Sequence, residues 1–218
     1  MADHCLLYYI TDRSQFRGDE LNRRRVLLEK IAEAARARVD YIHLRERDLS
    51  ARDLETLARA AIAVVRANSA STRLLINSRT DIALAAGADG VHLRAGDVSP
   101  RDVQIMLGLA GHRPPVTDHF LVAASCHSNE DVIRAESEGA AFVVFAPVFG
   151  KNAAPGMKAT GLAALREACR AEIPVLALGG ITLENAAATL TAGASGVAGI
   201  RLFQENRIED VVRALRAL

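Results

Sequence analysis

The chain has 218 residues, half of them hydrophobic, and a formal net charge of +1 at pH 7. This length suits one sizeable core, so we expect a single domain over residues 1–218. The near-zero charge creates no overall field that would attract a polyanion, which argues against nucleic acid or a membrane surface as the partner.

The sequence also lacks the signals of export. No stretch approaches the roughly 20 apolar residues that cross a bilayer, and the N-terminus has no signal-peptide pattern. The three cysteines, Cys5, Cys126 and Cys169, have an odd count and no CxxC spacing. We therefore expect a cytoplasmic protein without a disulfide framework or a zinc site. The oligomeric state does not follow from the sequence, and a homo-oligomer is possible.

Short apolar runs alternate with helical segments along the chain. Runs rich in Val, Ile and Leu are typical of parallel strands that are buried on both faces. The expected strands are 5–11, 41–45, 73–77, 90–93, 120–125, 142–148, 174–178 and 196–200. The expected helices are 20–38, 51–68, 81–86, 100–109, 129–139, 161–171, 183–192 and 208–218.

Eight strand–helix units in a chain of this length predict an α/β fold, a single (βα)8 TIM barrel. Polar residues before several helices supply start signals, namely Ser50, Ser99, Ser128 and Thr182. The alternative is an open doubly wound sheet, which usually has fewer strands and a nucleotide fingerprint. The sequence contains neither GxGxxG nor GxxxxGK[ST].

In a TIM barrel the active site lies at the carboxyl ends of the strands. After the second strand, His43, Arg45 and Arg47 alternate and should share one face. Facing the barrel mouth, they would bind a carboxylate or a phosphate. The alternative for Arg47 is a solvated position in the loop.

The stretch SCHSNED (125–131) places a histidine where the fifth strand gives way to a helix. Ser125 and His127 share strand parity and should face the mouth together, while Cys126 should face the helices. Histidine is suited to moving a proton at cellular pH. The alternative is a structural histidine at a strand end.

The stretch ALGGIT (177–182) ends a strand in two glycines, with a helix expected directly afterwards. Glycine permits close approach of a ligand to the backbone, and helix-start N–H groups attract anions. We therefore expect Gly179 and Gly180 to bind a phosphate, with Gly199, Ile200 and Arg201 adding to the site. The alternative is a tight turn that serves packing.

Four stretches together resemble the thiamine phosphate synthase superfamily: YIHLRERDLSARDL (41–54), LLINSRTDIALAAGADGVHL (74–93), SCHSNEDVIRAESEGAAFVVFAPVF (125–149) and IPVLALGGIT (173–182). The resemblance covers nearly the whole chain. It implies a (βα)8 barrel that acts on a thiazole phosphate in thiamin biosynthesis. The superfamily has two branches, the synthase and the thiazole tautomerase TenI.

The synthase branch joins a pyrimidine pyrophosphate to the thiazole phosphate with Mg²⁺. It typically carries Gln-x-Arg-x-Lys where this chain has His43, Arg45 and Arg47, and Asn-Asp where it has Asn77-Ser78. The Thr-x-Thr-Lys-type loop that the synthase has after its sixth strand is also not matched by residues 150–160, which read GKNAAPGMKAT. Asp97 stands at a metal-binding carboxylate of that branch, so it would be the metal ligand only in a synthase.

The tautomerase branch resembles the IHLRER and SCHS stretches more closely. It implies an isomerase without metal or cofactor, in which His127 transfers the proton. Substrate-binding residues would be His43, Arg45, Arg47, Asn77, Ser125 and Lys158. We expect the tautomerase first and the synthase, a transferase, as the alternative. A further alternative is a catalytically inactive barrel that binds thiazole phosphate as a regulator.

Overall fold

The computed structural model describes residues 5–109, 120–150 and 159–218. Its strands are β1 (Leu6–Ile10), β2 (Tyr41–Leu44), β3 (Arg73–Asn77), β4 (Gly90–Leu93), β5 (Leu121–Cys126), β6 (Phe142–Phe145), β7 (Val175–Ala177) and β8 (Gly196–Gly199). They pair in parallel in sequence order, and β8 returns to β1 to close the barrel. The predicted (βα)8 barrel is confirmed.

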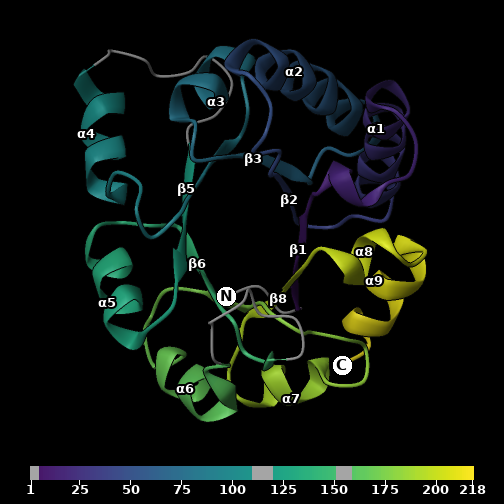
Figure 1. Cartoon of the computed structure of the whole chain (residues 1–218). Coiled ribbons are helices and arrows are strands. Elements are labelled where there is room, and N and C mark those ends of the chain that lie inside the picture. The colour runs from purple at the N-terminus through teal and green to yellow at the C-terminus, as the bar shows by residue number, and fades with distance from the viewer. Residues whose placement is uncertain (1–4, 110–119, 151–158) are drawn as a thin grey trace.

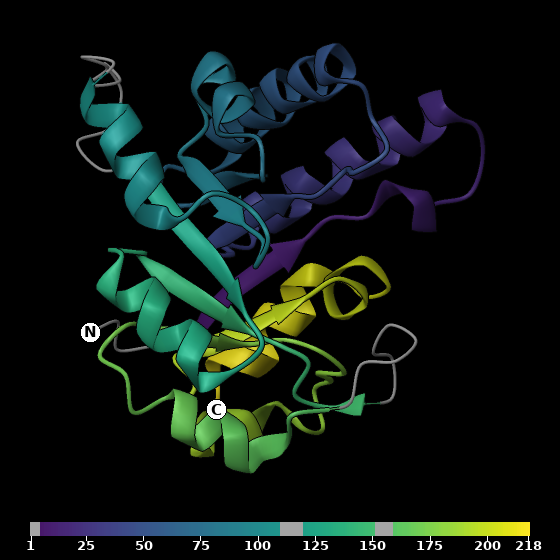
Figure 2. The same cartoon turned by 60° about the vertical axis from the view of Figure 1, so that its left-hand side comes forward.

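The helices surround this barrel, as the view along its axis shows (Figure 1). They are α1 (Glu20–Arg36), α2 (Ala51–Asn68), α3 (Thr80–Ala86), α4 (Pro100–Leu109), α5 (Asn129–Ser137), α6 (Gly161–Ala168), α7 (Ala186–Thr191), α8 (Arg201–Gln204) and α9 (Ile208–Arg216). A 3-10 turn, η1 (Arg13–Gln15), follows β1. The turned view shows the strands running between the helical layers (Figure 2).

Strand alternation divides the core into two layers. One set of side chains fills the barrel interior and includes Tyr8, Leu75, Phe142 and Leu176. The other set packs between strands and helices and includes Cys126, which is 1% exposed. The predicted outward direction of Cys126 is therefore confirmed, because successive strand residues point to opposite faces.

Of the four predicted caps, Ser50, Ser99 and Ser128 are confirmed and Thr182 is not. Ser50 and Ser128 accept hydrogen bonds from the N–H groups three residues later, as N-caps do. Thr182 does not begin a helix: Asn185 accepts from the Thr182 N–H and donates to Gly180 O, which forms a turn. As a result α7 begins only at Ala186, and the prediction of a helix directly after the two glycines was wrong.

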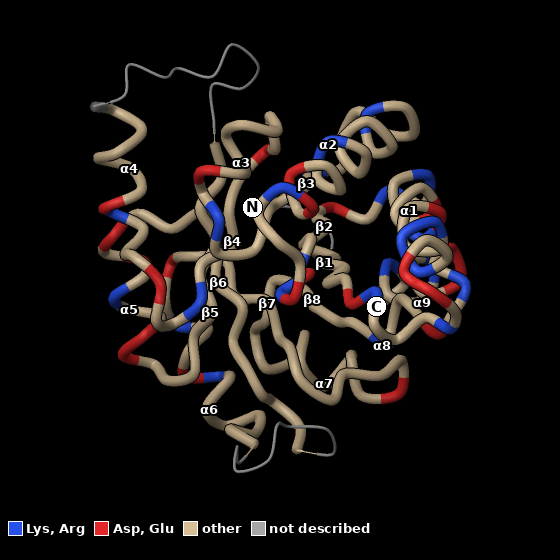
Figure 3. The backbone as a smooth tube through the Cα atoms, turned by 45° about the horizontal axis from the view of Figure 1, so that its top comes forward, with Lys and Arg blue, Asp and Glu red and all other residues tan. Residues whose placement is uncertain are grey.

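Charged side chains on the helices pair with each other. Acidic and basic residues are interleaved along α1 and α9 (Figure 3), for example Arg25 with Glu29 and Arg213 with Glu209. In the part of the chain that the structure describes, no helix is long and apolar enough to cross a membrane. The absence of a nucleic-acid partner stays a prediction.

Candidate active site

Two adjoining cavities open among the residues that follow the carboxyl ends of the strands. The larger, about 750 Å³, is lined by Gly179, Gly180, Gly199, Ile200 and Arg201 among others, and we call it the glycine cavity. The smaller, about 450 Å³, is lined by His43, Asn77, His92, Arg94 and Ser125 among others, and we call it the histidine cavity. Arg45, His127, Ala146 and Leu178 line both.

Arg45 stands on this shared wall, held by the end of β1. Its backbone N–H donates to Thr11 Oγ1 at 3.0 Å, and the Thr11 hydroxyl donates to Glu46 Oε1 at 2.6 Å. Burial, together with the charge of Arg47, lowers the pKa of the Arg45 guanidinium. Arg47 itself is exposed and lines neither cavity. Of the two arginines predicted to share a face, the structure brings only Arg45 to the site.

A buried ion cluster that sequence reasoning missed supports this wall. Arg13, 4% exposed, pairs with the nearly buried carboxylate of Glu46 at 3.0 Å and with Asp48 at 2.6 Å. Hydrogen bonds from these carboxylates, with Asp48 the strongest partner, raise the pKa of Arg13. Charged residues directly after the first two strands were the available signal. The cluster joins the loops after β1 and β2 and so fixes Arg45.

The histidine cavity contains two stacked imidazoles. The rings of His43 and His92 lie 4.3 Å apart at an interplanar angle of 26°, and each side chain is 2% exposed. Burial is the main cause of the low pKa of both rings, which for His92 falls to about 3. Both rings are therefore neutral at cellular pH. Among the described residues, neither ring nitrogen of His43 has a hydrogen-bond partner.

Ser125 enters the same cavity from β5. Its hydroxyl lies 2.8 Å from His92 Nε2, and His92 Nδ1 lies 3.1 Å from the hydroxyl of Tyr8. Tyr8 was predicted only as part of the first strand. The structure thus gives His92 two defined partners on opposite sides of its ring.

His127 lines both cavities and is oriented by its own backbone surroundings. Its Nδ1 lies 2.7 Å from Ala146 O. A carbonyl oxygen only accepts, so Nδ1 carries the proton and Nε2 of the neutral ring is left as an acceptor. This is the tautomer required of a general base that acts through Nε2. The predicted shared orientation of Ser125 and His127 agrees with their common lining of the histidine cavity.

Cys126 has no chemical role in this arrangement. The thiol is buried on the helix side of the barrel, and burial raises its pKa to about 12. A thiolate nucleophile needs a lowered pKa and access to the substrate. Cys126 has neither.

The two glycines line the glycine cavity as predicted, but the helix expected directly after them is absent. Gly179 and Gly180 have positive φ values of 100° and 67°. A Cβ on Gly179 would lie 2.7 Å from Pro147 Cα, so close packing alone already requires glycine there. No helix starts at these residues. The helix start beside the cavity is that of α8, where Arg201 is the first residue.

Three side chains that carry oxygen atoms lie close together after the ends of β3 and β4. The Asn77 amide donates to Ser78 Oγ at 3.0 Å, and the Ser78 hydroxyl bonds to Asp97. Asn77 Oδ1 is buried without a partner among the described residues. Asp97 also pairs with Arg94 at 3.0 Å.

This donor set was compared with the needs of Mg²⁺, which the synthase resemblance implies. Magnesium takes oxygen ligands and often uses one or two carboxylates plus substrate phosphates. Asn77, Ser78 and Asp97 offer oxygen ligands of this kind, with Asn77 on the wall of the histidine cavity and the other two directly behind it in the hydrogen-bonded chain. The described residues contain no group of three or more His, Cys, Asp or Glu side chains that would hold a metal unaided.

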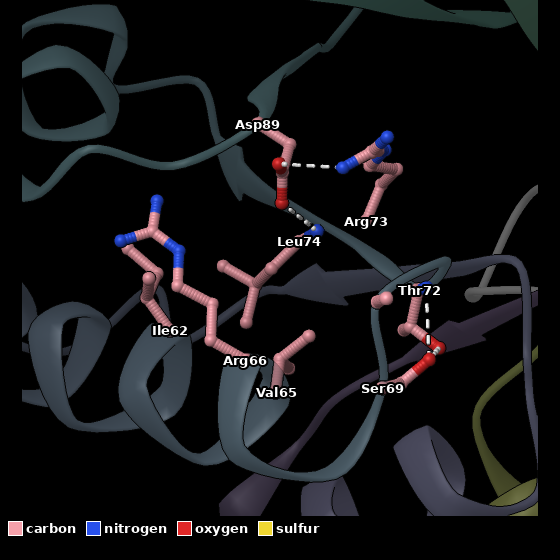
Figure 4. Close-up of a pocket in the computed structure, with 9 residues that line it drawn as sticks. Ile62, Val65, Arg66, Ser69, Thr72, Arg73, Leu74 and Asp89 are labelled. Carbon is pink, nitrogen blue, oxygen red and sulfur yellow. Dashed lines mark hydrogen bonds and ion pairs between the residues drawn. The ribbon is translucent and has the colours of Figure 1, made fainter. Parts of the chain in front are cut away.

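One predicted binding residue is not described by the structure, and a third cavity lies at the other end of the barrel. Lys158, expected to bind substrate, lies outside the described residues. A third cavity, about 160 Å³, lies where β3 begins, and its polar groups bond to each other: Asp89 accepts from Leu74 N and pairs with Arg73 (Figure 4). The amino-terminal face of such a barrel serves stability rather than catalysis.

Comparison with known proteins points to one family. The sequence profile described as "Thiamine monophosphate synthase" matches residues 7–203. The thiamine-phosphate synthase of Methanoculleus marisnigri is 38% identical over 217 residues, which cover 96% of this chain and 93% of that protein. That of Caldanaerobacter subterraneus subsp. tengcongensis is 32% identical over 216 residues, 96% of this chain and 93% of the relative.

A solved structure agrees with these sequences. The thiamine phosphate pyrophosphorylase of Pyrococcus furiosus superposes with a TM-score of 0.78 at 26% identity. The match covers 97% of this chain and 94% of that one.

Proposed function

Because the chain belongs to the thiamine monophosphate synthase family, we propose that it is the transferase that joins hydroxymethylpyrimidine pyrophosphate to thiazole phosphate. The observation that carries this proposal is the pair of cavities with a shared wall. A condensation needs two substrates side by side, and each cavity offers different chemistry. The names of the relatives support this reaction more than the tautomerase that we predicted first.

The glycine cavity suits the thiazole phosphate. Arg201, the first residue of α8, provides a charged donor on the wall of the cavity. The glycines allow the phosphate to approach the backbone closely. The histidine cavity, lined by two neutral imidazoles and Asn77, suits an uncharged pyrimidine ring.

The pyrophosphate would then lie toward the shared wall, where Arg45, alone among the described cationic residues, lines both cavities. In the reaction the bond between the pyrimidine methylene carbon and a pyrophosphate oxygen breaks, and the thiazole nitrogen bonds to that carbon. The electron pair leaves with pyrophosphate. Arg45 stabilises this developing charge, since a guanidinium binds two phosphate oxygens at once.

Magnesium bound with the pyrophosphate would be held by Asn77, Ser78 and Asp97, and it would supply neutralisation of the leaving group. The contribution of the chain itself is to orient the two substrates and to exclude water. Holding two reactants at bonding distance can supply about 7–11 kcal/mol of the barrier.

A second function is favoured by one specific observation, the tautomer of His127. A base with an open Nε2 on the shared wall suits a thiazole tautomerase. There it would take a proton from the ring carbon that bears the carboxylate and return it to the exocyclic carbon, which makes the ring aromatic. Ser78, which stands where the synthase branch has an aspartate, also supports this reading.

One experiment separates these functions. The purified protein receives hydroxymethylpyrimidine pyrophosphate, thiazole phosphate and Mg²⁺, and release of pyrophosphate is measured with and without EDTA. In parallel it receives the non-aromatic carboxythiazole phosphate tautomer in deuterated water, followed by NMR. Release of pyrophosphate that EDTA abolishes supports the synthase, whereas metal-independent aromatisation alone would replace it with the tautomerase. Binding of thiazole phosphate without either reaction would indicate a regulator.

A further inference from the structure

Three polar side chains form a continuous line through the barrel interior. The Tyr8 hydroxyl from β1 contacts Nδ1 of His92 on β4, and Nε2 of His92 contacts the Ser125 hydroxyl on β5. Tyr8 is fully buried and His92 is 2% exposed, while Ser125 is half-buried where it lines the histidine cavity. The line therefore runs from the closed core to a ligand site.

The buried end of the line determines the direction of its hydrogen bonds. A phenol hydroxyl has one proton to donate, and leaving a buried donor without an acceptor costs about 1–3 kcal/mol. Among the described residues, His92 Nδ1 is the one hydrogen-bond partner of the Tyr8 hydroxyl. Tyr8 therefore donates to Nδ1, and its pKa, raised by burial, keeps this proton in place.

His92, in the middle of the line, can donate on one side only if it accepts on the other. Burial first, and then the charge of Arg45, keep the His92 ring neutral. A neutral imidazole has one N–H and one acceptor nitrogen. With Nδ1 accepting from Tyr8, the proton must be on Nε2, which donates to Ser125 Oγ.

At the end of the line that faces the cavity, the direction of the last hydrogen bond is then fixed. Because Ser125 Oγ accepts from His92, its own proton is left to point into the histidine cavity. We propose that Tyr8 and His92 act as positioning residues, which make Ser125 a hydrogen-bond donor toward the bound ligand. The ligand must present an acceptor there, such as the unprotonated nitrogen of a neutral heterocycle.

A second observation supports a ligand site in this cavity. Both ring nitrogens of His43 and Asn77 Oδ1 are buried and line the cavity, and within the described residues their one mutual contact, between Asn77 and the His43 ring, is not a hydrogen bond of full geometry. Buried polar groups are normally paired, and a bound molecule would pair the ring nitrogen of His43 that the Asn77 contact leaves open. The identity of that molecule as a pyrimidine rests on the proposed function, but the direction of the line does not.

The test is the tautomer of His92, measured without substrate. Protein labelled with ¹⁵N-histidine is examined by NMR at pH 7, with His92→Gln used to assign its signals. We expect a protonated Nε2 and an unprotonated, hydrogen-bonded Nδ1. In Tyr8→Phe, which removes only the hydroxyl, a population with a protonated Nδ1 should appear. Tyr41→Phe, in a neighbouring ring of the same cluster, is the matched control and should keep the wild-type spectrum.

Kinetics then connect the line to the ligand. Tyr8→Phe should raise KM for the pyrimidine substrate about tenfold, the effect of roughly one hydrogen bond, and change kcat less. A wild-type ring protonated on Nδ1, or an unchanged ring in Tyr8→Phe, would overturn the proposal. If the expected tautomer is found but no pyrimidine pyrophosphate reacts, the line stands and the transferase assignment fails.

Discussion

His43 lies flat against His92, with the ring centroids 4.3 Å apart, and both rings are kept neutral by burial. Two charged imidazoles could not share this position without strong repulsion in a medium of low dielectric constant. In the folded protein these two histidines therefore stay unprotonated at pH values where, in the unfolded chain, they bind protons with a pKa near 6.5. This difference links the stability of the barrel to pH.

The first prediction concerns that link. For a histidine whose pKa is lower in the folded state, the contributed stability is present above about pH 6.5 and is lost as the pH falls toward the folded value, which is about 3 for His92. Between pH 7.5 and 5.5 the pair should cost up to about 3 kcal/mol of unfolding free energy. Urea denaturation at the two pH values measures it. The double variant His43→Gln, His92→Gln should show a smaller difference; an equal difference would contradict the assignment.

The second prediction separates Arg45 from Arg47. Arg45→Lys keeps the charge but loses the planar fork that binds two phosphate oxygens, so kcat/KM should fall about 10–100-fold. Arg47→Ala should change kcat/KM by less than about threefold, because that side chain is exposed and lines neither cavity. Steady-state kinetics on both variants provide the comparison. Equal losses would place Arg47 in the site.

The third prediction concerns the phosphate. Arg201→Gln removes the charged donor from the glycine cavity, and a hydrogen bond to a charged group contributes about 1.5–3 kcal/mol. The Kd for thiazole phosphate should therefore rise about 10–100-fold, while binding of the unphosphorylated thiazole alcohol should stay unchanged. Calorimetric titration measures both. Arg207→Gln, next to the lining residue Asn206 but itself outside the cavity linings, is the matched control. Equal weakening of both ligands would remove Arg201 from the phosphate site.

The fourth prediction concerns His127. In His127→Gln the side-chain amide can still donate to Ala146 O but cannot act as a base. The reaction to follow is proton exchange at the carboxylate-bearing ring carbon of the carboxythiazole phosphate tautomer, measured by NMR in deuterated water. If His127 is the base, this exchange should slow about 10²–10⁴-fold in the variant. Thiazole phosphate should bind as before. Exchange at the wild-type rate would make His127 a structural residue.

Much of the fold could be predicted because each strand carries its own signal. The runs 73–77 and 90–93 have the bounds of β3 and β4, since short apolar segments between polar turns are read locally. The helix α8 (Arg201–Gln204) was not expected, because four residues are too few to show a helical period. Thr182 resembled a cap, but the competing turn made by Asn185 determined the structure.

The candidate site was predictable in its location but not in its contacts. The rule that sites follow the strands led to His43, Arg45 and His127, which line the cavities. Parity gives the face of a strand on which a residue lies, but not its partner on a distant strand. Tyr8 and His92 are 84 positions apart and meet only when the barrel is closed. The support of Arg45 by Arg13 and Glu46 was hidden for the same reason.

Closure of the barrel between β1 and β8 has a consequence for synthesis on the ribosome. Tyr9 on β1 pairs with Gly199 on β8. The second edge of β1 therefore stays uncovered until β8 has been translated. Until then β1 and β7 each present open hydrogen-bonding edges, which invite pairing with other chains. The glycine cavity needs residues 196–201, so a nascent chain that lacks them has no complete site. The complete site therefore forms only after residue 201 has been added.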